Sequence, residues 1–236
     1  MNFKVNKLST VLLLLSTGSS FAGAMGPIAE DFYPKEGVYL GAGVSASINN
    51  NKFSTSAPSV ANVLNISANN TTALGNAFLG YGQTFLNNLY LGGEANLLTP
   101  RVAKFNRNGL IATSTVFEDK YTIDNSFSLD LLPGYRLNSS LLVYGRVGMA
   151  FTNVHMNQQG VTNAEQNLAN SANFVNGRFG AGITYGFTKH FAASVDYYYT
   201  YAPRFGTFSA LPTLANQQFD FKTSSNVIGM SLVYTV

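Results

Sequence analysis

From residue 37 to residue 236, apolar and polar residues alternate with a period of two in eight separate stretches. In the first stretch Val38, Leu40 and Ala42 share one parity, while Tyr39 and Gly41 take the other. This period predicts β-strands with two unlike faces. We expect strands at residues 37–48, 76–85, 89–99, 124–137, 141–156, 177–188, 190–202 and 221–236.

The connections between these stretches alternate in length. Three are short, and their Asn, Ser and Thr residues suit tight hairpins: 86–88, 138–140 and 188–190. Four are long and polar: 49–75, 100–123, 157–176 and 203–219. Such alternation, with both ends on the short-turn side, is typical of an even-stranded membrane barrel with periplasmic turns and extracellular loops.

Six charged residues within the eight stretches fall on the polar parity. They are Glu94, Asp130, Arg136, Arg146, Arg178 and Asp196. A basic side chain on the lipid face costs up to about 2–4 kcal/mol at the bilayer midplane, so we expect this parity to face a narrow lumen. Three acids and three bases there should pair, because an unpaired buried charge is costly. We predict a lumen charge network, either structural or acting as a gate.

Together these patterns predict an all-β fold: an eight-stranded antiparallel up-and-down transmembrane β-barrel with short periplasmic turns and long extracellular loops. The composition agrees, because only 11% of the residues are charged, against about 25% in a typical soluble domain. The sequence contains no cysteine, so disulfides cannot stabilise an exported form, whereas a closed barrel pairs all its strand backbone groups.

The N-terminal residues predict export. Lys4 and Lys7 precede the apolar run 11–15, and Ala22-Gly23-Ala24 is a cleavage sequence for a signal peptide. We expect a signal peptide at 1–24, a periplasmic segment without structure at 25–36 and a barrel domain at 37–236. Loss of the two lysines changes the formal net charge from +3 to about +1, so we expect no nucleic-acid partner.

Four motifs carry a resemblance to a known family. They begin at Gly37 (GVYLGAG), Phe78 (FLGYG), Leu89 (LYLGGEA) and Pro133 (PGYR). With them the chain resembles the small outer-membrane barrels of the OmpA-like and opacity-protein type. This resemblance implies a location in the outer membrane of a Gram-negative bacterium, with loops at the cell surface.

The C-terminal residues add to this resemblance. Tyr234-Thr-Val236 is similar to the aromatic-x-aromatic ending that the barrel-assembly machinery reads in that family, with Val236 where the family usually has Phe. Tyr234 and Val236 are therefore the candidate assembly signal.

Candidate catalytic chemistry is weak. Some barrels of this size act on lipid A with a Ser/His pair, but His155 and His190 fit ordinary rim hydrogen bonds better. The inward carboxylates fit salt bridges better than a general acid and base pair. No cluster of Cys, His and carboxylates has metal-ligand spacing. We expect no catalysis, no cofactor and no metal.

The long loops carry the remaining candidates. Arg101, Lys104 and Arg107 could contact lipopolysaccharide phosphates, although solvated loop charge is the simpler interpretation. The expected partners are outer-membrane lipid and lipopolysaccharide, the barrel-assembly machinery and host surface molecules.

Three functions fit the sequence. The first is a structural or surface-interaction role, such as adhesion or host contact, through the extracellular loops. The second is a narrow channel for ions or small solutes through the charged lumen. The third is a secreted, lipocalin-like soluble barrel with its apolar face inside. The shortage of charge on the polar parity argues against the third, and we favour the first.

Overall fold

The structure of the protein is a computed structural model that describes residues 33–57, 60–99, 101–107, 117–160, 168–201, 208–209 and 218–236. Its strands are β1 (Gly37–Ala57), β2 (Val60–Thr84), β3 (Leu89–Leu98), β4 (Arg101–Arg107), β5 (Phe117–Arg136), β6 (Leu141–Gly160), β7 (Leu168–Gly186), β8 (Phe191–Tyr201), β9 (Phe208–Ser209) and β10 (Gln218–Thr235). The expected signal peptide lies outside the described residues. In the part of the chain that is described, no helix is long and apolar enough to cross a membrane.

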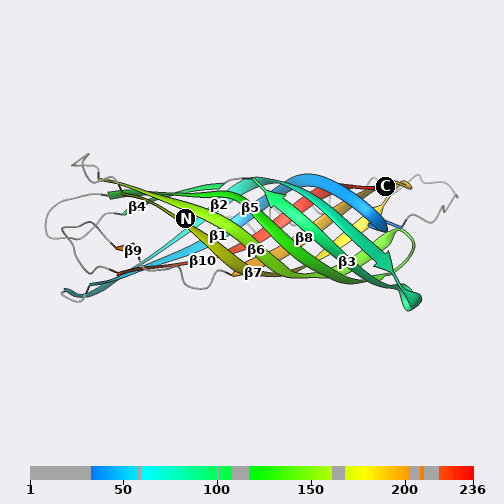
Figure 1. Ribbon diagram of the computed structural model, residues 1–236, viewed down its shortest axis with the longest axis horizontal. Coiled ribbons are helices and arrows are strands. Elements are labelled where there is room, and N and C mark those ends of the chain that lie inside the picture. The colour runs from blue at the N-terminus through cyan, green and yellow to red at the C-terminus, as the bar shows by residue number, and fades with distance from the viewer. Residues whose placement is uncertain are drawn as a thin grey trace, which may run out of the picture. The chain divides into compact units, whose positions relative to one another are not determined.

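Eight of these strands form a closed antiparallel barrel in the order β1, β2, β3, β5, β6, β7, β8 and β10 (Figure 1). The barrel closes between β1 and β10, whose pairing runs from Tyr39 with Thr235 to Ser56 with Gln218. The short strands β4 and β9 pair with β5 and β10 beyond the barrel wall. The predicted fold class is confirmed.

The two ends of the barrel differ as predicted. At one end, short turns join β2 to β3, β5 to β6 and β7 to β8. The first of these turns is η2 (Leu86–Asn88), in which Asn87 and Asn88 have φ values of 66° and 63°. Asn tolerates this left-handed conformation better than most residues, which explains its use in the turn. At the other end the strands continue as long hairpins (Figure 1).

The expected loop boundaries need correction. Residues 49–75 were expected to be a loop, but β1 and β2 stay paired from Gly37 with Gly82 as far as Ala57 with Val60. The other long connections also contain paired strand, such as β4 against residues 117–123 of β5. The physical reason is that a period of two requires two unlike strand faces. Asn, Ser and Thr fall on both parities of these extensions in the sequence, so the period-two signal disappears while backbone pairing continues.

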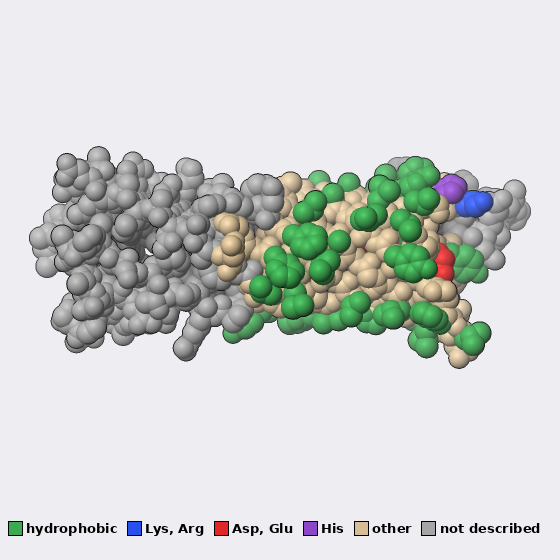
Figure 2. Space-filling model, in the orientation of Figure 1, with side chains coloured by type: hydrophobic (Ala, Val, Ile, Leu, Met, Phe, Trp, Pro, Cys, Tyr) green, Lys and Arg blue, Asp and Glu red, His purple; other side chains and the backbone are tan. Residues whose placement is uncertain are grey.

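The faces of the barrel are arranged as the parity predicts. On β1, Leu40 and Val44 are 48% and 70% exposed, whereas Tyr39, which has the other parity, is fully buried. Figure 2 shows hydrophobic side chains over the barrel wall on this face, with acidic and basic side chains only near one end of the described part. A lipocalin-like soluble barrel would have the opposite orientation, so that alternative is wrong.

Candidate functional site

Arg146 on β6 is the centre of an ion-pair network in the lumen. Its Nη1 lies 2.7 Å from Oε1 of Glu94 on β3 and 2.7 Å from Oδ2 of Asp130 on β5. Its Nη2 lies 3.0 Å from Oδ1 of Asp196 on β8. All four residues are buried. A planar guanidinium with five N–H donors suits this arrangement, because it reaches three carboxylates from three different strands.

Arg178 on β7 extends the network toward the long hairpins. Its Nη1 lies 3.5 Å from Oδ2 of Asp130 and donates to Oγ of Ser128. Its guanidinium carbon lies 3.6 Å from the centre of the Tyr198 ring, a cation–π contact. Asn96 also donates to Asp130 Oδ2, at 2.9 Å. Asp130 therefore has partners from three other strands, β3, β6 and β7.

Arg136 lies in a different place from the other predicted bases. It is the last residue of β5, so it lies at the short-turn rim. There its Nη2 lies 2.8 Å from Oε2 of Glu36 and donates to the carbonyl of Pro34 at 2.9 Å, and its Nε donates to Thr84. Grouping Arg136 with the lumen acids from parity alone ignored its height along the barrel axis.

Lys35 supplies the third base of the lumen. Its Nζ lies 3.1 Å from Glu94 Oε2 and donates to the Tyr144 hydroxyl at 3.1 Å, and the residue is fully buried. Sequence reasoning missed this residue, because it precedes the first alternating stretch and was assigned to a segment without structure. Residues 33–36 differ from that expectation. They form a turn, called here the N-terminal turn, in which Glu36 N–H donates to the Tyr33 carbonyl at 3.3 Å.

Aromatic side chains fill the lumen around these charges. Tyr39 and Tyr144 are almost completely buried, and Tyr39 packs edge-on against Phe78 with ring centres 6.4 Å apart. Inward glycines leave the space that these rings need. A Cβ atom at Gly80 would lie 2.3 Å from the Tyr39 ring, and one at Gly182 would lie 2.5 Å from the Tyr144 ring.

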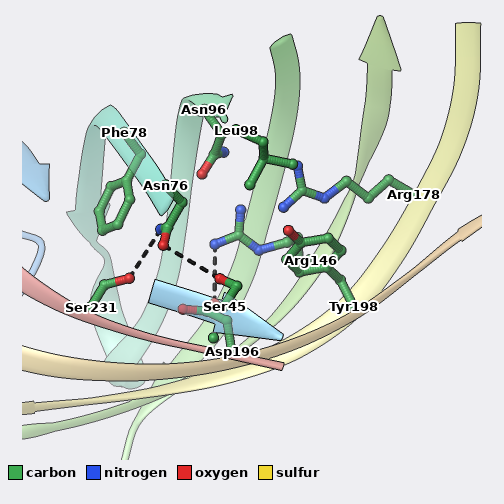
Figure 3. A pocket seen from close by; sticks show the side chains of 11 residues that line it. Ser45, Asn76, Phe78, Asn96, Leu98, Arg146, Arg178, Asp196, Tyr198 and Ser231 are labelled. Atoms are coloured by element: carbon green, nitrogen blue, oxygen red, sulfur yellow. Dashed lines mark hydrogen bonds and ion pairs between the residues drawn. The ribbon is translucent and has the colours of Figure 1, made fainter. Parts of the chain in front are cut away.

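A small polar cavity lies beside the network. It has about 10 Å³ of room for the centre of a water-sized sphere, which corresponds to roughly one water molecule. Arg146, Arg178 and Asp196 line it together with Asn76. Figure 3 shows Asn76 between two serines, donating to Ser231 at 3.1 Å and accepting from Ser45 at 3.4 Å.

The short-turn rim has its own carboxylate. Thr84 donates to Glu36 from its backbone N–H at 3.0 Å and from its hydroxyl at 2.6 Å, while Arg136 forms the ion pair. Partial burial raises the pKa of Glu36, but the hydrogen bonds from Thr84 and Arg136 lower it further, so the pKa lies below its ordinary value.

The candidate assembly signal lies at the same rim. Val236 N–H donates to the carbonyl of Val38 at 3.0 Å, which extends the pairing with β1. The Tyr234 ring lies 5.2 Å from Phe191 and 5.6 Å from His190, centre to centre. His190 Nδ1 lies 2.9 Å from the Thr235 carbonyl oxygen, an ordinary rim contact. Recognition of this ending remains a prediction.

The structure leaves other candidates at the level of prediction. Arg101, Lys104 and Arg107 belong to β4, but their side chains lie outside the described part, as does that of His155. Among the described side chains no group of three or more His, Cys, Asp or Glu could hold a metal ion.

Comparison with known protein families supports the barrel. The chain matches the family described as outer membrane protein beta-barrel domain over residues 10–235. A comparison with curated proteins found no match.

Solved structures with a similar fold are outer-membrane proteins. OprG from Pseudomonas aeruginosa is 15% identical, with 86% of this chain and 97% of that chain covered and a TM-score of 0.57. OmpT, an outer-membrane protease from Escherichia coli, is 8% identical over 84% and 97%, with a TM-score of 0.45. Ail from Yersinia pestis, solved with the heparin analogue sucrose octasulfate, is 12% identical over 81% and 98%, with a TM-score of 0.37. At 15% identity the likeness to OprG shows the fold alone.

Proposed function

The chain belongs to the family of outer membrane protein β-barrel domains of the bacterial outer membrane, and from this premise we propose a surface-interaction role without catalysis. In this role the barrel anchors hairpins at the cell surface, and buried side chains fill the lumen around Arg146. The candidate partners of the hairpins are lipopolysaccharide and host surface molecules. The barrel-assembly machinery acts during biogenesis.

The filled lumen is the observation that supports this proposal most. Arg146 joins carboxylates from β3, β5 and β8, and Lys35 and Tyr144 fill the space next to Glu94. The cavity beside these groups has room for about one water molecule, which supports a lumen filled by side chains at this level. An eight-stranded barrel is narrow enough for side chains to fill in this way.

The hairpins support the surface role. Among the described side chains of β1, the last large apolar residue that is exposed is Ile48, and the strand continues to Ala57. Residues 49–57 rise about 3.3 Å each, so they extend roughly 30 Å along the strand beyond the apolar wall. A paired hairpin of this length supports a role in which a partner reaches the backbone of the extension beyond the apolar wall.

The test is to shorten this hairpin while keeping the barrel. Asn50 pairs with Asn69, so residues 51–68 can be replaced by an Asn-Gly turn without a change of register. We expect the shortened protein to fold, as seen by heat-modified migration on gels, and bacteria carrying it to bind host cells or lipopolysaccharide-coated surfaces less than bacteria with the full chain. Equal binding by both would contradict the role of this hairpin.

A narrow channel remains the second candidate. Ion pairs of Arg146 with Glu94 and Asp196 hold the lumen closed, and the polar cavity lies directly beside them. An exchange of partners within this network would widen the path on one side. A channel of this kind would conduct in a planar bilayer, whereas the surface role requires no conduction.

A further inference from the structure

The lumen charges carried by the barrel strands do not balance without Lys35. Three acids, Glu94, Asp130 and Asp196, face two bases, Arg146 and Arg178, which leaves one negative charge in excess. Arg136 is engaged by Glu36 at the rim. The missing positive charge therefore comes from the N-terminal turn, which lies outside the barrel strands. A buried excess charge is costly, so this lumen requires a cation.

The groups around the Lys35 ammonium are those that bind an ammonium ion: a carboxylate, a hydroxyl and three aromatic rings. Its Nζ lies 3.1 Å from Glu94 Oε2 and 3.1 Å from the Tyr144 hydroxyl oxygen. Three rings surround it, with centres at 4.5 Å for Tyr144 and 5.2 Å for both Tyr39 and Phe78. A carboxylate together with aromatic rings is the combination by which proteins recognise organic cations.

In the N-terminal turn Lys35 has a backbone conformation that a lysine residue disfavours. Lys35 has a φ of 60°, in the third position of a turn with Pro34 in the second, where type II turns favour Gly. This conformation is strained for a residue with a Cβ atom. The strain is tolerated because the side chain fills the ammonium site.

Side-chain contacts hold the N-terminal turn in the periplasmic mouth of the barrel, among them two hydrogen bonds from Thr84 to Glu36. Tyr90 donates to the Lys35 carbonyl at 3.1 Å, and Lys35 N–H donates to the Thr235 hydroxyl at 3.3 Å. Arg136 holds the carbonyl of Pro34 and the carboxylate of Glu36. None of these contacts belongs to the pairing between barrel strands, so the turn can leave while the barrel stays closed.

We propose that the pocket of Glu94, Tyr144, Tyr39 and Phe78 is a binding site for a primary ammonium group, which Lys35 occupies in the resting state. Its ligand is a primary amine on a slim aliphatic chain, such as an alkylammonium or the end of a polyamine, entering from the periplasmic side. Such a ligand reproduces the two contacts of Nζ to oxygen. A quaternary ammonium has no N–H and cannot make them.

The first test uses a Lys35→Gly variant, since glycine accepts the φ of 60° without strain. The probe is n-butylammonium chloride, and the controls are tetramethylammonium chloride and KCl at equal ionic strength. We expect butylammonium at about ten times its dissociation constant to raise the Tm of the variant by roughly 3–5 °C more than either control. A second change, Glu94→Gln, should remove the difference. Equal Tm values in all three salts would overturn the proposal.

The second test uses the unchanged protein and decides the matter if the variant does not fold. Acetic anhydride labels accessible lysines, and mass spectrometry gives the rate at Lys35 relative to Lys189, which is exposed in a short turn and serves as the internal reference. Lys35 should label at least tenfold more slowly than Lys189, and butylammonium should raise the ratio, because it displaces Lys35. A ratio that butylammonium leaves unchanged would refute the site without affecting the surface role of the hairpins.

Discussion

Nη1 of Arg146 lies 2.7 Å from Oε1 of Glu94, and this ion pair spans the lumen from β6 to β3 with both side chains buried. Because the same guanidinium also meets Asp130 and Asp196, one side chain ties four strands of the wall together. Buried ion pairs of this kind contribute little when compared with apolar residues of equal size, but removing one partner is strongly destabilising.

Arg146→Ala should therefore lower the stability of the folded barrel by about 3–5 kcal/mol, since it leaves carboxylates in the lumen without their shared base. The barrel should still assemble, because the strand pattern and the lipid face are unchanged. Urea unfolding in lipid vesicles measures the loss. Arg136→Ala is the matched control, because its partner Glu36 is partly exposed at the rim. The same loss in both variants would contradict a special role for Arg146.

A charge on the barrel wall should block folding into the membrane. Leu40 and Met149 are 48% and 54% exposed on the face that meets lipid. Replacement of either by Arg should cost about 2–4 kcal/mol near the bilayer midplane. Heat-modified migration on gels reports the folded fraction. Asn69→Arg, in the polar extension of β2, is the control and should fold as well as the unchanged protein.

A side chain added at an inward glycine should destabilise the barrel where an aromatic ring packs against that glycine. Gly80→Ala places a Cβ atom 2.3 Å from the Tyr39 ring, and the overpacking should cost about 1–3 kcal/mol. Gly93→Ala is the control, because a Cβ atom there has nothing within 4 Å. Urea unfolding compares the two. In a Tyr39→Ala background the Gly80→Ala change should cost much less, and an undiminished cost would show that the ring is not the cause.

The rim should respond to acid through Glu36. Its folded-state pKa is lowered, so the contacts of the ionised carboxylate contribute stability above the unfolded pKa of about 4.3 and lose it as the pH falls through the folded value. The Thr84 amide donates to this carboxylate, so its NMR shift should titrate with a midpoint below the ordinary pKa of a glutamate side chain. Glu36→Gln should abolish the titration. A midpoint at or above the ordinary value would mean that the contacts are absent in solution.

The membrane-spanning parts of the strands could be predicted from the sequence, whereas the hairpin extensions could not. Within the membrane, lipid on one side and a narrow lumen on the other impose period two, so the alternation at Val38, Leu40 and Ala42 identifies both the strand and its outer face. In the hairpin extensions Asn, Ser and Thr fall on both parities, and residues 49–57 and 60–75 show no such period although they are strand.

The pairing of the charged residues could not be predicted from parity alone. Parity places Arg136 inside, but its height at the end of β5 brings it to Glu36 and away from the lumen acids. Lys35 lies before the first alternating stretch, so no periodicity indicated where its side chain lies. In the structure the N-terminal turn places this side chain beside Glu94. An estimate of each residue's height along its strand would have shown that Arg136 lies at the rim and that the lumen lacks a base.

Single-channel recording of the purified, folded protein in a planar bilayer tests most directly whether the lumen is closed. With Arg146 and Lys35 paired to Glu94 across it, we predict a silent bilayer at voltages that leave the barrel intact. Steady conductance from the unchanged protein would contradict the closed lumen and favour the channel.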